Sequence, residues 1–336
     1  MAEEPIKTWQ WVTVDDYEKP AIPTTIKIKK WWQKFIGWVT PDDEQEAEEE
    51  QSQALELSFD EAAEALDECF ADWLHDDKDN SLRWIIAPPH SGVTEAVQKW
   101  VEKQQITELS LPDRALLSDP NTASLPEFPP KGNISSPWIM PQLAHGFLRQ
   151  TNGLRWVREF FSQVLSGDAG KGIIVCDSWA WAFLEKVWPV PVNQLWTLQA
   201  LDQDALQKLG LARGDGRLRA LAALSRGNAG VAAAYSDRYQ RDSEQAFETP
   251  VLPSDISDAT AFVCYALLLH KGLSKAHLVQ VLPIVSASQL EIQLQVLKQR
   301  GLIEREQEQE LWYVTARGYP VVRELLAARD FWLDRF

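Results

Sequence analysis

The sequence predicts an α/β protein, in which a mostly parallel sheet is covered by helices and followed by a smaller α+β domain. Two apolar runs, residues 82–87 and 172–177, have the continuous hydrophobicity of parallel strands that are buried on both faces. A helical pattern follows each run, as expected for strand–helix–strand units. After residue 258 the order changes to three helices, two short strands and a last helix, which predicts the second domain.

Composition limits the classes of function. The 336 residues suffice for two domains and an extension, and the formal net charge of −16 argues against a nucleic-acid partner. The cysteines lie far apart in apolar surroundings, which is typical of buried thiols in a reducing cytoplasm. The sequence shows neither a signal peptide nor an apolar run of about 20 residues. We therefore expect a cytoplasmic protein without a structural metal, soluble or attached peripherally to the inner face of a membrane.

Residues 1–51 form an arm rich in Trp and Lys that ends in an acidic linker, residues 42–51. Its basic and aromatic part has the composition of an interfacial segment. Three alternatives stay open: packing on the protein's own body or on a partner protein, contact with a membrane, and a disordered arm. The candidate residues for contact with a membrane or a partner are Lys27, Lys29, Lys30, Trp31, Trp32, Lys34, Phe35 and Trp38.

The elements between residues 52 and 200 follow from periodicity. Ser58 and Glu61 have the spacing of a capping box at the start of a helix. Residues 112–137 are rich in Pro, Ser and Asp and predict a surface loop. The remaining expectations are helices over 59–74, 92–103 and 142–165, the last with a break near residues 152–153, and strands over 82–87, 106–111, 172–177 and 194–198.

Residues 87–94, Ala-Pro-Pro-His-Ser-Gly-Val-Thr, have the outline of a phosphate-binding loop between a strand and a helix. Against the pattern G-x-x-x-x-G-K-[ST] the loop keeps Gly92 and Thr94 but has Ala87 for the first glycine and Val93 for the lysine. The strand over 172–177 ends in Asp177, in the manner of a Walker B strand, and Ser178 follows it. Residues 226–230, Arg-Gly-Asn-Ala-Gly, interrupt an Ala- and Leu-rich helical segment.

With these motifs, residues 52–237 resemble the core and helical lid of an AAA/STAND-type P-loop ATPase with degenerate Walker motifs. The loop agrees with the family form G-P-P-G-S-G-K-T at five of eight positions: Pro88, Pro89, Ser91, Gly92 and Thr94. The resemblance implies a P-loop NTPase-like sheet with a helical lid. It also implies that a bound nucleotide would contact His90, Ser91, Gly92, Val93, Thr94 and Asp177.

The departures remove groups on which the chemistry depends. Val93 cannot supply the charged hydrogen bonds of the family lysine, and His90 places a Cβ where glycine lets the loop approach a phosphate. Ser178 stands where the family commonly has a glutamate that activates water, so we assign no catalytic residue. We expect no cofactor, while weak binding of ATP or ADP with Mg²⁺, and hydrolysis, stay open as alternatives. Nothing in the sequence brings a substitute lysine, such as Lys99 or Lys171, to the loop.

The order of elements in the last 79 residues resembles a winged helix. Its second-to-last helix is rich in Ser and Gln, and the tip between its two strands is acidic, with Glu304, Glu306, Glu308 and Glu310. A helix that reads a DNA groove normally carries more Arg and Lys. This composition favours a protein partner over nucleic acid.

We therefore expect a catalytically inactive pseudo-ATPase that acts as a regulatory or scaffolding protein, attached through its arm to a membrane complex. A divergent ATPase activated by a partner subunit and a winged-helix DNA-binding regulator are the two alternatives. The expected organisation is an arm and linker (1–51), an α/β core (52–200), a helical lid (201–237), a linker (238–257) and a winged-helix-like domain (258–336).

Overall fold

The computed structural model describes residues 8–20, 57–119, 137–167, 169–189, 192, 194–239, 249–253 and 256–336. The eight arm residues expected to contact a membrane or a partner, Lys27 to Trp38, lie outside this set. Two earlier tryptophans, Trp9 and Trp11, are described and belong to the core, at 4% and 7% exposure. The Trp11 indole donates a hydrogen bond to the carbonyl oxygen of Ala62 at 2.8 Å. These two indoles therefore pack on the protein's own body.

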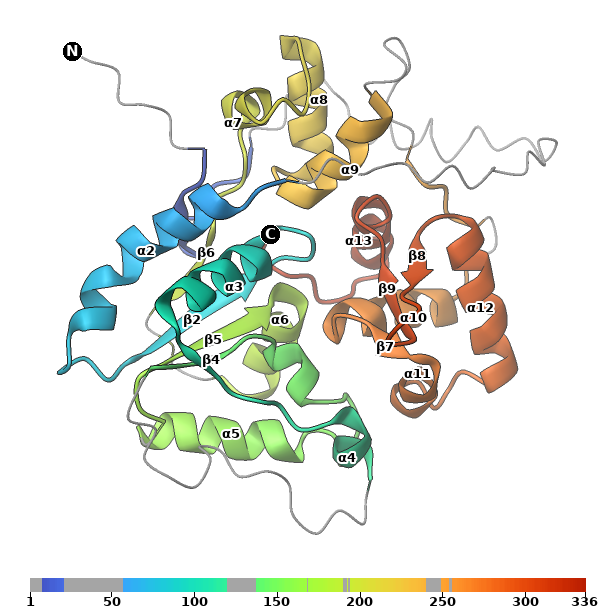
Figure 1. Cartoon of the computed structure of the whole chain (residues 1–336). Coiled ribbons are helices and arrows are strands. Elements are labelled where there is room, and N and C mark those ends of the chain that lie inside the picture. Colours follow the sequence, from blue (N-terminus) through green and yellow to red (C-terminus); the bar gives the residue numbers. More distant parts are fainter. Residues whose placement is uncertain are drawn as a thin grey trace.

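The fold class is the expected one: a parallel-dominated α/β sheet with helices on both faces, followed by a smaller unit of helices and a short antiparallel sheet (Figure 1). The sheet has the strand order β1-β6-β2-β5-β4-β3, and only β1 pairs antiparallel. Both predicted central strands, β2 and β5, have the expected bounds. The six strands are β1 (Trp11–Thr13), β2 (Leu82–Ala87), β3 (Thr107–Glu108), β4 (Trp138–Met140), β5 (Gly172–Asp177) and β6 (Leu195–Leu198).

Large aromatic side chains cover both faces of this sheet, because successive strand residues point to opposite sides. Trp84 packs against Phe161 of α5 (Arg155–Ser166) and Trp181 of α6 (Ser178–Val187), with ring centroids 6.1 and 5.2 Å away. On β6, Trp196 pairs in register with Ile85 and so faces the other side, where it contacts Phe70 of α2 (Asp60–His75). Helix α3 (Val93–Gln104) packs beside α2. The sheet therefore lies between two layers of helices, α5 and α6 on one face and α2 and α3 on the other.

The segment expected as a helical lid contains three short helices, for which we keep the name lid: α7 (Gln203–Lys208), α8 (Asp215–Ser225) and α9 (Ala229–Tyr239). Asp202 caps α7, because its carboxylate accepts the backbone N–H of Ala205 at 2.8 Å. The expected interruption lies between α8 and α9, where Arg226 and Gly227 adopt positive φ angles. In Figure 1 the lid lies above the end of the sheet at which β2 and β5 finish.

The C-terminal unit carries three helices, a three-stranded antiparallel sheet and a last helix, whereas the sequence order predicted only two strands and missed the two-residue β7. Ser286 and Gln289 form a capping box at the start of α12. Its elements are α10 (Asp258–Leu269), β7 (Leu273–Ser274), α11 (Lys275–Val281), α12 (Ala287–Gln299), β8 (Ile303–Arg305), β9 (Leu311–Val314) and α13 (Tyr319–Ala327).

Several local expectations were wrong. The expected loop over 112–137 contains helix α4 (Arg114–Ser118). Strand β4 begins directly after the expected loop, at Trp138. Of the helix expected over 142–165, the part after the expected break near residues 152–153 forms as α5, whereas the part before it is a 3₁₀ turn, η1 (Leu143–Gly146), because Leu148 and Gly153 close a turn between them. The capping box at Ser58 does not form: Phe59 is the N-cap, and the Ser58 hydroxyl donates to the carboxylate of Asp60.

Among the described residues, no helix is long and apolar enough to cross a membrane. All three cysteines are free thiols; Cys176 and Cys264 are buried, whereas Cys69 is half-buried.

Candidate functional site

The six residues expected to contact a nucleotide lie together. His90, Ser91, Gly92, Val93, Thr94 and Asp177 all line one cavity of about 270 Å³. Ala87 and Asp177 are register partners at the ends of β2 and β5, which places the carboxylate beside the loop that follows Ala87. The opposite wall belongs to the C-terminal unit, including Lys271 and Val314. The residues expected from the sequence therefore form one wall of this cavity, and the C-terminal unit forms the other.

The loop backbone has two residues in the left-handed region. Gly92 has φ +80°, and a Cβ placed on it would lie 2.0 Å from a ring carbon of Phe59, so only glycine fits. His90 has φ +63°, a strained conformation for a residue with a Cβ. The His90 ring lies 3.0 Å, through Nε2, from the carbonyl oxygen of Val314 in the C-terminal unit. This hydrogen bond and the packing around the ring hold the strained residue in place.

Several backbone N–H and C=O groups of the loop form hydrogen bonds within the loop or with the lid. The Ser91 N–H donates to the carbonyl oxygen of Pro88 at 3.1 Å, and the Val93 N–H donates to the hydroxyl of Ser91 at 3.4 Å. On the lid side, Asn228 donates to the carbonyl oxygen of Pro89 and Gly230 to that of His90, at 2.8 and 2.9 Å. A phosphate cradle needs N–H groups that point at the ligand. Two of them are engaged here within the loop itself.

A lysine does reach the site, from a position that the sequence did not indicate. The ammonium of Lys271 lies 3.1 Å from the Thr94 hydroxyl and 3.8 Å from a carboxylate oxygen of Asp177. We call this group of three the Lys271 contact. The two substitutes considered from the sequence lie elsewhere: Lys99 pairs with the carboxylate of Asp60, and Lys171 donates to two backbone carbonyls.

Arg114 fixes the turn that carries Lys271. Its buried guanidinium donates to the carbonyl oxygens of His270 and Gly272, the two neighbours of Lys271, and to that of Ala144. Sequence reasoning missed both Arg114 and Lys271, because the two residues lie far apart in the sequence and share no local pattern. Tertiary packing alone brings them together.

Burial controls protonation at the site. Desolvation raises the pKa of Asp177, and the nearby Lys271 and Arg114 charges oppose that rise. Desolvation lowers the pKa of His90 to about 4, so its ring is neutral near pH 7. Because the partner of Nε2 is a carbonyl oxygen, Nε2 carries the proton and donates.

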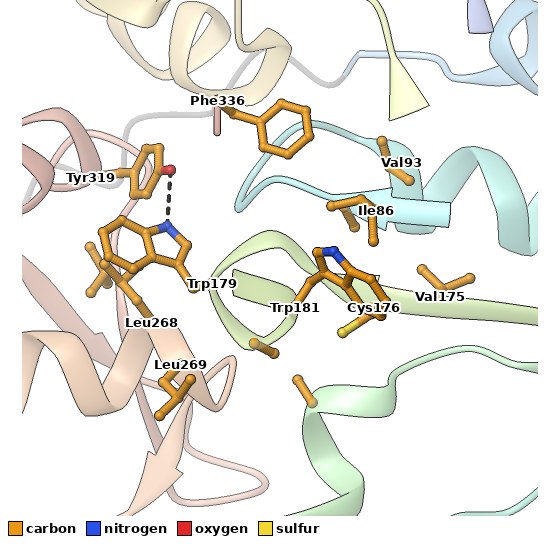
Figure 2. Close-up of a cluster of buried hydrophobic side chains, with 14 of the residues drawn as sticks. Ile86, Val93, Val175, Cys176, Trp179, Trp181, Leu268, Leu269, Tyr319 and Phe336 are labelled. Carbon is orange, nitrogen blue, oxygen red and sulfur yellow. Dashed lines mark hydrogen bonds between the residues drawn. The ribbon is translucent and has the colours of Figure 1, made fainter. Parts of the chain in front are cut away.

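The cleft between the loop and the lid is filled by the chain itself. Phe336 lines it together with residues of the loop, β6 and the lid, and only about 30 Å³ of space remains. The Phe336 ring packs edge-on against Tyr17 with ring centroids 4.8 Å apart, and its carbonyl oxygen accepts a hydrogen bond from Arg226 at 3.1 Å. Figure 2 shows Phe336 in the same buried cluster as Val93 and Ile86.

Ser178, at the position expected for a water-activating glutamate, belongs to a second contact with the C-terminal unit. Its hydroxyl donates to the carboxylate of Asp334, which also forms a buried ion pair with Arg323. The hydroxyl of Tyr319 lies 3.4 Å from the same carboxylate and accepts the indole N–H of Trp179 at 3.2 Å (Figure 2). We call these five residues the Asp334 seam. Ser178 serves packing between the two units.

A magnesium nucleotide does not fit these residues as they lie. An ammonium stands against the two oxygens that would bind the metal, and two loop N–H groups are engaged within the loop. The cleft beside the loop holds about 30 Å³, whereas ligand pockets usually have about 300–1,000 Å³. Among the described residues, no group of three or more His, Cys, Asp or Glu side chains is placed to hold a metal ion.

In comparisons with known proteins, no family model matches the chain, and no curated protein matches it. Among solved structures, Cdc6p from Pyrobaculum aerophilum is 13% identical, over 87% of this chain and 97% of that one, with a TM-score of 0.31. The ORC2 protein of Aeropyrum pernix, in ADPNP-ADP complexes, is 14% identical over 83% and 97%, also with a TM-score of 0.31.

Proposed function

We propose that the protein is a regulatory or scaffolding member of the P-loop fold that does not hydrolyse nucleotide. One observation carries this proposal: only about 30 Å³ of space remains in the cleft between loop and lid, which is lined by Phe336, and Tyr17 and Arg226 hold Phe336 in place. A nucleoside would have to displace this aromatic ring and the hydrogen bond from Arg226 to the Phe336 carbonyl oxygen before it could enter. The absence of a lysine at Val93 and the use of Ser178 in the Asp334 seam point the same way.

The C-terminal unit supports action through protein contacts. Ile284, just before α12, and Ile292 on that helix are 74% and 59% exposed. Large exposed aliphatic side chains favour a protein partner, whereas a DNA-reading helix presents cations to phosphates. In addition, two cations of this unit already form ion pairs within it: Lys275 with Glu291, and Arg305 with Glu310.

Isothermal titration of the whole chain with ATP and Mg²⁺ tests the first part of the proposal. We expect no binding heat and no phosphate release. The matched variant Phe336→Ala, which empties part of the cleft, reports whether the ring is the obstacle. Micromolar affinity of the unaltered chain, together with turnover that is lost in Asp177→Asn, would overturn the proposal.

Partner capture and a mobility shift test the second part. We expect Ile292→Glu to remove a co-purifying protein that the unaltered chain retains, while Gln295→Glu, which adds the same charge to an exposed position on the same helix, keeps it. Retention by both variants would contradict a partner surface on α12. A shift of random duplex DNA at low salt would instead favour a nucleic-acid partner.

A further inference from the structure

We propose that Lys271 is a tethered cation that takes the place of a divalent metal ion, so that the Lys271 contact and metal binding at Thr94 and Asp177 exclude each other. The inference deepens the proposed function and rests on it in treating the loop as non-hydrolytic. It starts from the Lys271 contact, in which one ammonium approaches a hydroxyl oxygen at 3.1 Å and a carboxylate oxygen at 3.8 Å.

The two oxygens are of the kind that a hard divalent cation selects. Mg²⁺ is usually held by one or two carboxylates with several waters, and in P-loops by the hydroxyl that ends the loop. Thr94 lies in the first turn of α3, and Asp177 ends the neighbouring parallel strand, so the fold brings both oxygens to one point. A divalent ion and the ammonium would repel each other there, so the ammonium must leave before the ion can bind.

The placement of Lys271 is built into the fold. Arg114, at 9% exposure, holds the carbonyl groups on both sides of Lys271, and the His90 ring bonds to Val314 on the adjoining strand β9. The Lys271 side chain is 33% exposed, whereas the Asp177 side chain is 5% exposed. The carboxylate is therefore fixed in the buried site, while the ammonium can move out into water.

The cavity has room for what would replace the ammonium. Its volume of about 270 Å³ exceeds that of several water molecules, each of which occupies about 30 Å³ in the liquid. Glu95 also lines this cavity and adds a second carboxylate near Thr94 and Asp177. Removal of the Lys271 charge would leave a buried carboxylate that lacks its nearest cation, and a hydrated divalent ion is the natural replacement.

Electron paramagnetic resonance of Mn²⁺ with the full chain, free of nucleotide, tests this inference. The series is the unaltered chain, Lys271→Met, Lys271→Met/Asp177→Asn and, as a control lysine on the same unit, Lys275→Met. We expect Lys271→Met to gain a site that binds Mn²⁺ at least about tenfold more tightly than the unaltered chain does. The Asp177→Asn change should remove that site, and Lys275→Met should behave like the unaltered chain. The double variant also corrects for Mn²⁺ bound elsewhere on this acidic surface.

Equal Mn²⁺ binding by the unaltered chain and Lys271→Met would overturn the inference, as would a gained site that persists after Asp177→Asn. Lys271→Arg, which keeps the charge, should bind no more Mn²⁺ than the unaltered chain. Lys271→Gln repeats the test if the Met variant does not fold, as judged by circular dichroism. Because no nucleotide is present, ATP turnover by the unaltered chain would refute the proposed function and leave this readout standing.

Discussion

Among the polar contacts that join the α/β core to the C-terminal unit, the Asp334 seam and the Lys271 contact differ in how far water reaches them. In the Asp334 seam, the side chains of Arg323 and Asp334 are 5% and 1% exposed, whereas the Lys271 side chain is 33% exposed. An ion pair cut off from water costs a great deal to break on one side, while a partly hydrated ammonium exchanges readily with solvent. The difference indicates that the seam is a permanent part of the fold and that the Lys271 contact can open.

The largest expected effect follows from breaking the seam. Asp334→Ala leaves the buried guanidinium of Arg323 without its carboxylate, and we expect the free energy of unfolding to fall by about 3–5 kcal/mol. Urea unfolding followed by circular dichroism measures this loss. The double replacement Arg323→Met/Asp334→Leu, which removes both charges, should cost clearly less. A loss below about 1 kcal/mol in the single variant would show that the seam is not a permanent joint.

An intermediate effect comes from pH, through His90 at the edge of the Lys271 contact. Its pKa is lowered from 6.5 to about 4 in the folded chain, so the unfolded chain takes up this proton first as the pH falls. Stability from this group is therefore complete above about pH 6.5 and is lost as the pH falls toward 4, with a total on the order of 3 kcal/mol.

Thermal unfolding of the unaltered chain and of His90→Asn across that window isolates the contribution. Asn tolerates the left-handed backbone at this position but does not titrate. His145, whose pKa burial lowers to about 3, titrates in both proteins and cancels in the difference. Identical pH profiles for the two proteins would show that the His90 ring is already hydrated.

The smallest expected effect belongs to Lys271 itself. Lys271→Met should lower the free energy of unfolding by about 1 kcal/mol or less, because the ammonium is partly hydrated and its ion pair is screened. The loss should shrink as salt rises, as measured by urea unfolding at low and high NaCl. A loss as large as that of Asp334→Ala would reverse the ranking of the two contacts.

The sequence predicts elements well where a local pattern exists and fails where only packing decides. Strands β2 and β5 are continuous apolar runs, and their bounds agreed with expectation. Strand β1 and the three-residue β4 are too short to show a pattern, and both exist because a neighbouring strand pairs with them. Likewise, the loop residues and Asp177 follow from a motif, whereas Lys271 reaches them only through the docking of a separate unit.

Gly92 shows that a motif residue can be retained for a reason unrelated to phosphate. Phe59 occupies the space that any side chain at position 92 would need, and the same ring packs on Trp9 with centroids 5.2 Å apart. The glycine is therefore required by the contact between the start of α2 and the loop, with or without a ligand. Substitution of Gly92 would disturb this packing first, so loss of function in such a variant would be no evidence that the protein binds nucleotide.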